Sequence, residues 1–230
     1  MINEIYVNGD SYSAINSGIT PYSKFLNDLS GIPVINYAMS GSSNDRIFRT
    51  TLEYCTSLPE NKKSLIVIGF SFVTREETWI KNISQYSHRI KDYPGSKFIT
   101  TDWLGHADIN KQTQHLIIDQ NINKQMINFY TKLFMLTQTL KQLNLPYFLF
   151  SAADNTNFKE LDWTSLRELN MYKRVQQDIY IVDLHNFNVS AWATAHSIST
   201  TSTSHLYTEG HKQFAEFLFQ NYIHDLLTKN

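Results

Sequence analysis

The sequence has a single cysteine, Cys55, in 230 residues. One thiol excludes an internal disulfide and any zinc site built on cysteines. Cys55 lies at helical spacing from Ile47 and Thr51, so we expect a buried thiol that packs as a small apolar group and not a catalytic one. Histidines and carboxylates are not spaced as in metal-ligand motifs, and we expect neither a metal nor another cofactor.

An excess of charge of either sign is also missing. The chain has 20 Lys and Arg against 21 Asp and Glu, for a formal net charge of −1, and its basic residues are scattered. These values give no electrostatic reason to expect nucleic acid or an anionic lipid surface as a partner.

Long apolar runs are missing as well. The longest, from Leu65 to Val73, is interrupted by Gly69 and Ser71 and is far too short to span a bilayer. A basic segment followed by an apolar one, which would indicate a secretory signal, is not seen at the start. We therefore expect a soluble, cytoplasmic protein that does not associate with membranes.

Apolar residues are nevertheless abundant, at 42% with 13% aromatic, and the length suits one large α/β domain over residues 1–230. Five short apolar segments are predicted strands, and helical patterns separate most of them. The strands are the run from Ile5 to Gly9, Pro33–Met39, Ser64–Phe70, Pro146–Ser151 and Asp178–Asp183. This order predicts a flavodoxin-like three-layer α/β/α sandwich with a central parallel sheet of about five strands.

Predicted helices begin at Thr20-Pro21, at Ser43 or Asn44, at Asp119, near Thr164 and at Thr208. Residues 72–118 do not continue the pattern and are rich in aromatic side chains and histidine. Because they leave the carboxyl end of the third strand, we expect them to lie over or beside the active edge. We interpret them as a partly helical insertion. It would form either a wall of the substrate pocket or an oligomer contact.

The first strand ends in Gly9-Asp10-Ser11, which places a serine hydroxyl at the carboxyl edge of the sheet. In open α/β sheets that edge binds ligands. The tripeptide is compatible with an ordinary turn and with a nucleophile, so its meaning depends on whether a base reaches the same edge.

His205 is the histidine best placed to be that base. It lies in a loop between the fifth strand and the last helix, and that loop also leaves the carboxyl edge. Histidine is the side chain best suited to take a serine proton at neutral pH. His211, inside the helix that follows, is interpreted as a packing or capping residue.

Acyl transfer also requires hydrogen-bond donors for an oxyanion. The backbone N–H of Ser11 and that of Gly41, after the second strand, are candidates, because a glycine allows close backbone approach. Ser71, beyond the third strand, and Asn44 are candidate side-chain donors.

These blocks together resemble the GDSL, or SGNH, hydrolase superfamily over nearly the whole chain. Gly9-Asp10-Ser11 resembles its first block, Asn36 to Gly41 its second, and His205 with Gly210-His211 its last. The resemblance implies a Ser–His esterase or deacylase with a flavodoxin-like sandwich and no required cofactor. A Gly-x-Ser-x-Gly elbow, the mark of other serine hydrolases, does not occur.

Two positions depart from that family. Its third block reads Gly-x-Asn-Asp and supplies an oxyanion donor, but this chain has Gly69-Phe70-Ser71-Phe72. Its last block has an aspartate three residues before the histidine, and here that residue is Ser202. A backbone carbonyl or a distant acid such as Asp183 would then orient His205, or the site is a weak dyad.

The leading hypothesis is a serine esterase that acts on small acyl esters, such as acetyl groups on carbohydrate. The alternatives are a catalytically impaired module that binds a glycan or a protein, suggested by the missing acid, and an acyltransferase on the same scaffold.

Overall fold

The computed structural model of this chain describes residues 2–15, 18–75, 77–79, 98–100, 121–155, 158–182, 184 and 187–228. Its main sheet is parallel, with four strands in the order β2-β1-β3-β6. The strands are β1 (Glu4–Gly9), β2 (Val34–Asn36), β3 (Ser64–Phe70) and β6 (Tyr147–Ser151). Every residue of β1, β3 and β6 is buried, as expected for strands covered on both faces.

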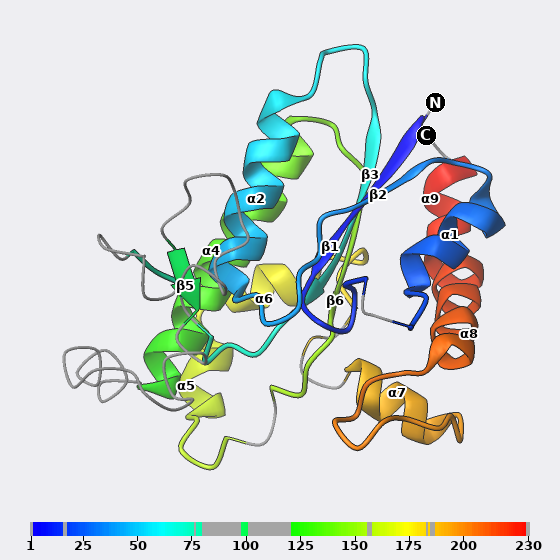
Figure 1. Cartoon of the computed structure of the whole chain (residues 1–230). Coiled ribbons are helices and arrows are strands. Elements are labelled where there is room, and N and C mark those ends of the chain that lie inside the picture. The colour runs from blue at the N-terminus through cyan, green and yellow to red at the C-terminus, as the bar shows by residue number, and fades with distance from the viewer. Residues whose placement is uncertain are drawn as a thin grey trace.

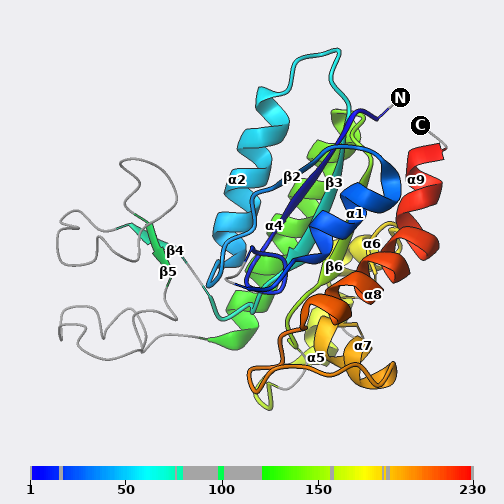
Figure 2. The same ribbon diagram turned by 45° about the vertical axis from the view of Figure 1, so that its right-hand side comes forward.

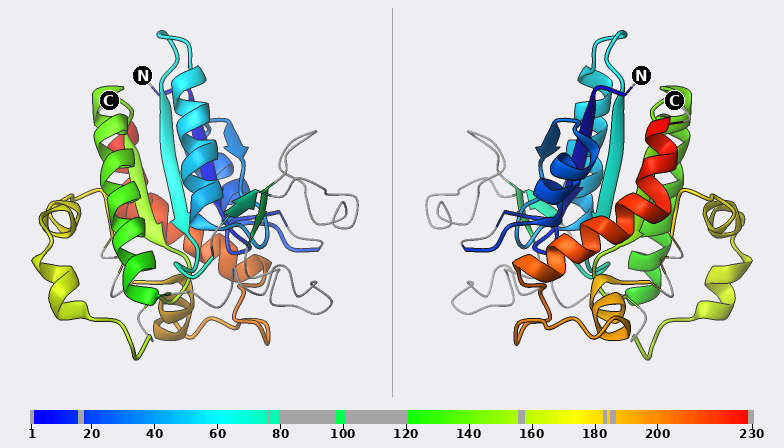
Figure 3. Two further views of the ribbon diagram at one scale, coloured as in Figure 1. Left: turned by 90° about the vertical axis from the view of Figure 1, so that its left-hand side faces the viewer. Right: turned by 90° about the vertical axis from the view of Figure 1, so that its right-hand side faces the viewer.

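Helices cover the two faces of this sheet and make three layers, as the sequence predicts (Figures 1 and 3). One face carries α1 (Tyr22–Ser30) and the C-terminal helix, which runs through α8 (Thr208–Leu218), the π-helical turn η3 (Phe219–Ile223) and α9 (His224–Thr228). The other face carries α2 (Asn44–Ser57), α4 (Ile122–Gln142) and α6 (Asn170–Gln176).

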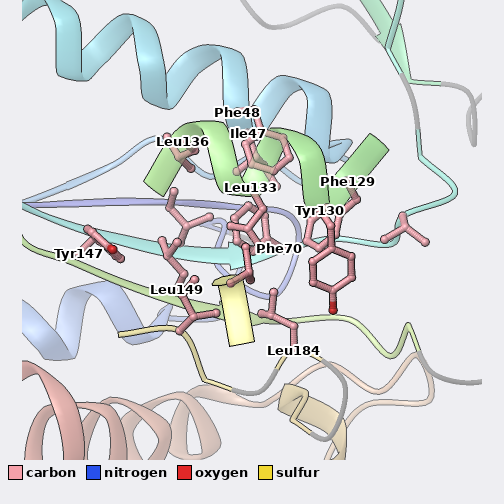
Figure 4. Packing of buried hydrophobic residues seen from close by; sticks show 14 of the residues in the cluster. Ile47, Phe48, Phe70, Phe129, Tyr130, Leu133, Leu136, Tyr147, Leu149 and Leu184 are labelled. Atoms are coloured by element: carbon pink, nitrogen blue, oxygen red, sulfur yellow. The ribbon is translucent and has the colours of Figure 1, made fainter. Parts of the chain in front are cut away.

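The core on the second face is built mainly from large side chains of β3, α2 and α4 (Figure 4). Phe70 of β3 packs edge-on against Phe129 of α4, with ring centroids 5.2 Å apart. Leu133 and Leu136, also from α4, are fully buried in the same cluster. Cys55 lies there too, and burial raises the pKa of its thiol to about 12, which keeps it protonated.

The predicted fifth strand is the main difference. Residues 178–182 contribute only one parallel bridge, between Ile181 and Leu149. The cause is Asp178, whose side chain accepts a hydrogen bond from the Tyr180 N–H at 3.1 Å and whose carbonyl accepts one from Ile181 at 3.0 Å. A local turn therefore replaces extended backbone, despite the β-branched residues that follow.

Helix ends follow the capping signals closely but not completely. Ser43 is the N-cap of α2 and accepts a hydrogen bond from the Arg46 N–H at 3.2 Å. Helix α1 begins one residue later than predicted, with Pro21 at the N-cap, and ends at Gly31 in the left-handed conformation (φ 68°). Two further helices are α5 (Trp163–Glu168) and α7 (Val189–Ala195), and the sequence pattern did not predict α7.

Within 72–118, the structure describes one antiparallel pair, β4 (Glu77–Trp79) with β5 (Phe98–Thr100) (Figure 2). The predicted helical part of that insertion lies outside the described residues. In the described part of the chain, no helix is long and apolar enough to cross a bilayer.

Both chain ends lie at the amino edge of the sheet, while α7 and the loop before α8 lie at the carboxyl edge (Figures 1 and 2). Residues from opposite ends of the chain therefore share the carboxyl edge.

Candidate active site

A tight turn after β1 carries Ser11. The N–H groups of Ser13 and Ala14 both donate to the Asp10 carbonyl, at 3.0 and 2.9 Å. The Asp10 side chain accepts a third hydrogen bond, from the Tyr12 N–H at 3.1 Å. This is the turn that an aspartate forms when its side chain bonds backbone two residues ahead, and it presents Ser11 at the carboxyl edge of the sheet.

Two glycines make room for that turn. Gly9 and Gly69 are register partners at the ends of β1 and β3, and the Ser13 side chain lies against both. A Cβ on Gly9 would lie 2.6 Å from Ser13 Oγ and 2.8 Å from the Gly69 carbonyl oxygen, and Gly9 has φ of 157°. Only glycine fits this conformation and this contact, so Gly9 sets the direction in which the chain leaves the strand.

A short hairpin loop presents His205 at the same edge. Thr200 and Leu206 form an antiparallel bridge, and the Thr201 N–H donates to the His205 carbonyl at 2.8 Å. Ser204 closes the loop with φ of 63°, the left-handed region that few residues other than glycine adopt.

The structure brings Ser11 and His205 together. His205 Nε2 lies 2.7 Å from Ser11 Oγ, although 194 residues separate the two in the chain. The imidazole stacks on the Tyr12 ring, with centroids 4.6 Å apart and an interplanar angle of 14°. Tyr12 is buried, so it forms a fixed wall against one face of the imidazole. A hydroxyl nucleophile and its general base require a separation of this size.

Thr203 binds the other nitrogen of the ring. Its Oγ1 lies 3.0 Å from His205 Nδ1 and 3.0 Å from the Thr201 hydroxyl. If Nε2 accepts the Ser11 proton, Nδ1 must carry hydrogen and donate it to Thr203, which in turn donates to Thr201. Ser202, the position predicted from the family pattern, is exposed, and Asp183 lies outside the described residues. The side chain that contacts Nδ1 is therefore at position 203, one residue after the position that the family pattern predicts.

Gly41 occupies the predicted loop after β2. The Met39 N–H donates to the Gly9 carbonyl at 3.1 Å, which ties this loop to the end of β1. A turn follows, in which the Ser42 N–H donates to the Met39 carbonyl at 3.1 Å and Gly41 has φ of 78°. Glycine adopts that conformation without steric cost, and the loop lies beside the turn that carries Ser11.

Asn44 and Ser71, the two predicted side-chain donors, are used within the structure itself. Asn44 Oδ1 accepts from the Ser71 N–H at 2.8 Å, and its Nδ2 donates to the carbonyls of Ser71 and Phe72 at 3.0 and 3.4 Å. The Ser71 hydroxyl donates its single hydrogen to Asp10 Oδ2 at 2.7 Å. Asn44 thus fixes the loop after β3 to the start of α2, and Ser71 braces Asp10.

Arg75 completes this cluster, and the sequence reasoning did not find it because residues 72–118 follow no regular pattern. Its Nη1 lies 2.9 Å from Ser71 Oγ and 3.2 Å from Asp10 Oδ2. Asp10 is fully buried, and burial raises the pKa of its carboxyl, while the hydrogen bonds from Ser71 and the Tyr12 N–H and the charge of Arg75 oppose that rise. A cation therefore lies against the residue that precedes Ser11.

His211 packs at the start of α8, as expected, and is 2% exposed. Burial lowers the pKa of its imidazole from the ordinary 6.5 to about 4, so this histidine stays neutral at physiological pH. Among the described residues, no group of three or more His, Cys, Asp or Glu side chains is placed to hold a metal ion.

Sequence comparison finds no match, either to a known family or to a curated protein. Solved structures do match. A member of the lipolytic G-D-S-L family from Veillonella parvula has a TM-score of 0.50 at 11% identity, with 96% of this chain and 98% of that chain covered.

Two esterases are similar at the same level. An acetyl xylan esterase, AlAXEase, has a TM-score of 0.50 at 13% identity and covers 95% of this chain and 99% of its own. A psychrotrophic esterase from Pseudoalteromonas sp. has a TM-score of 0.51 at 14% identity and covers 98% and 99%. The chain therefore has an SGNH-hydrolase-like fold, at 11–14% sequence identity to these neighbours.

Proposed function

We propose that this protein is a serine esterase or deacylase of the SGNH type that hydrolyses small acyl esters. The 2.7 Å contact between Ser11 Oγ and His205 Nε2 is the observation that carries the proposal. The likeness to esterase structures supports it at the level of the fold.

In the first half-reaction, Ser11 Oγ forms a bond to the ester carbonyl carbon while its proton passes to His205 Nε2. The carbonyl electron pair moves onto oxygen, and the backbone N–H groups of Ser11 and Gly41 stabilise the oxyanion. When the carbonyl re-forms, the alcohol leaves with the proton from His205. An acyl group then remains on Ser11.

In the second half-reaction, His205 takes a proton from water, and the hydroxide bonds to the acyl carbon. Collapse of that intermediate breaks the bond to Ser11 Oγ, which regains its proton from His205. A carboxylic acid is released. Thr203 acts through the base: its hydroxyl keeps the hydrogen of His205 on Nδ1, where it leaves Nε2 free to accept.

The proposed substrate is a small acyl ester, with acetyl groups on carbohydrate as the leading class. Support for the carbohydrate comes from one structural neighbour, an acetyl xylan esterase. An acyltransferase would use the same Ser–His pair with a hydroxyl acceptor in place of water.

Hydrolysis of p-nitrophenyl acetate tests the proposal directly. Ser11→Ala should reduce turnover to the rate of the uncatalysed reaction, because it removes the nucleophile. Ser13→Ala is the matched control: it removes a neighbouring hydroxyl that accepts from Tyr22 at 3.2 Å, so turnover should be retained. Equal rates for wild type and Ser11→Ala would refute the assignment of Ser11.

A catalytically impaired binding module is the second reading, because Thr203 cannot supply the negative charge of an orienting acid. A fluorophosphonate probe separates the two readings. Covalent labelling of Ser11 supports the esterase, whereas an unlabelled, folded protein favours the binding module.

A further inference from the structure

Arg75 places a cation against Asp10, at the start of the turn that carries Ser11. Its Nη1 donates to Ser71 Oγ at 2.9 Å and to Asp10 Oδ2 at 3.2 Å, and its guanidinium carbon lies 4.8 Å from the centroid of the Phe72 ring. The side chain is 17% exposed. Three contacts and this degree of burial hold the charge in one place.

That place is linked to the turn that carries Ser11 through Asp10. Asp10 precedes Ser11 directly, and its other carboxylate oxygen accepts from the Tyr12 N–H at 3.1 Å. Asp10 therefore connects Arg75 to the residues before and after Ser11. Ser71, the other partner of Nη1, occupies the position where the resembled family has its donor asparagine. As the Ser71 hydroxyl donates to Asp10, it cannot donate to an oxyanion as well.

We infer that the Arg75 guanidinium supplies the charge of the oxyanion site, in the place of the asparagine that this chain lacks. The inference rests on the proposed esterase function. A fixed cation stabilises the negative charge that develops when Ser11 attacks. The paired Asp10 carboxylate offsets part of its field, and the burial of Asp10 and Ser71 limits screening of the rest by water. The sheet edge then has two backbone donors and one cationic side chain, instead of three neutral donors.

The test is a kinetic series with p-nitrophenyl acetate as the neutral substrate. Arg75→Met should lower kcat about 100-fold or more, the cost of losing one group from an oxyanion site, and should change KM little. Arg75→Lys should recover part of kcat, because it restores the charge without the planar fork. Arg49→Met is the matched control. It removes an arginine of α2 whose Nη2 lies 2.8 Å from Oε1 of Glu77 in β4.

A merely structural role of Arg75, as the counter-ion of Asp10, makes a different prediction. Asp10→Asn removes the buried charge that needs a counter-ion, so in that background a structural Arg75 could be replaced by Met without further loss of kcat. If Arg75 stabilises the oxyanion, the double variant stays about 100-fold below Asp10→Asn. Equal kcat for Asp10→Asn and the double variant would overturn the inference.

Two more outcomes are decisive. A change confined to KM for the anionic ester mono-p-nitrophenyl succinate, with p-nitrophenyl acetate unaffected, would make Arg75 a substrate-charge binder and refute the oxyanion role. Fluorophosphonate labelling separates this inference from the proposed function. If wild type is not labelled at Ser11, the proposed function fails; if Arg75→Met is labelled as fast as wild type, only the oxyanion role fails.

Discussion

Thr203 should determine how well His205 works as a base. The Thr203 hydroxyl lies 3.0 Å from His205 Nδ1 and is the described side chain that binds this nitrogen. Thr203→Val keeps the shape of the side chain and removes the oxygen. The hydrogen on Nδ1 then loses its acceptor when the ring becomes charged in the transition state.

The size of the effect follows from exposure. A hydrogen bond to a charged group contributes about 1.5–3 kcal/mol. Thr203 is exposed, so water can partly replace its hydroxyl, and we expect the lower end of that range. A loss of about 1.5 kcal/mol corresponds to about a tenfold decrease in kcat/KM. Ser202→Ala, at the neighbouring exposed position, should change kcat/KM less than about twofold, because the described contact to His205 Nδ1 comes from Thr203.

Thr203→Asp tests the same contact with the opposite sign. A carboxylate beside Nδ1 stabilises the imidazolium that forms in the transition state, so kcat/KM at pH 8 should exceed that of wild type. Steady-state kinetics at this pH measure both variants. Unchanged kcat/KM for both Thr203 variants would refute the role of Thr203.

Three further predictions concern stability and are measured by denaturant unfolding. Because the pKa of buried His211 is about 4 and the ordinary value is 6.5, the unfolded chain binds a proton between these values that the folded chain does not, so stability falls as pH drops through this window. Wild type should lose about 2 kcal/mol between pH 7 and 5 that His211→Gln does not lose; equal losses would contradict the assignment. Gly9→Ala should destabilise the fold by more than about 3 kcal/mol, because the new Cβ would lie 2.8 Å from a backbone oxygen. Gly31→Ala, at φ 68° with no atom near the new Cβ, should destabilise it by only about 1 kcal/mol. Similar losses for the two variants would argue against close packing at Gly9. Leu133→Ala, in the core, should lower the free energy of unfolding by about 2–5 kcal/mol. Met135→Ala, at a side chain that is 61% exposed, should lower it by less than about 0.5 kcal/mol. A small loss for Leu133→Ala would place Leu133 outside the core.

The layered fold could be predicted because its strands have strong local signals. Ser64–Phe70 is an apolar run rich in β-branched residues, and it is the fully buried β3. Parallel strands share one carboxyl edge, so the position of Ser11 followed from its place after β1. His205 was predicted at that edge from a fifth strand, Asp178–Asp183, which is also rich in β-branched residues. The hydrogen bonds of Asp178 turn the backbone there, and the described residues 178–182 form a single bridge. A local side-chain interaction of this kind leaves no periodic signal.

The details of the site could not be predicted, because they depend on where loop side chains point. The Thr203 hydroxyl lies 3.0 Å from His205 Nδ1, although Thr203 and the neighbouring Ser202 are both exposed, and no spacing rule distinguishes these two positions in a hairpin loop. Arg75 reaches Asp10 from a stretch without regular pattern. Asn44 and Ser71 have suitable chemistry for oxyanion donors, but the structure uses their hydrogens to hold the loop after β3 and to brace Asp10.

The central claim is that His205 activates Ser11 as a nucleophile. The most direct measurement is the intact mass of the protein after reaction with a fluorophosphonate, followed by peptide mapping. One adduct on Ser11 is predicted for wild type, none for Ser11→Ala, and slow labelling for His205→Gln. An unmodified wild type that is folded, or an adduct on another residue, would contradict the account.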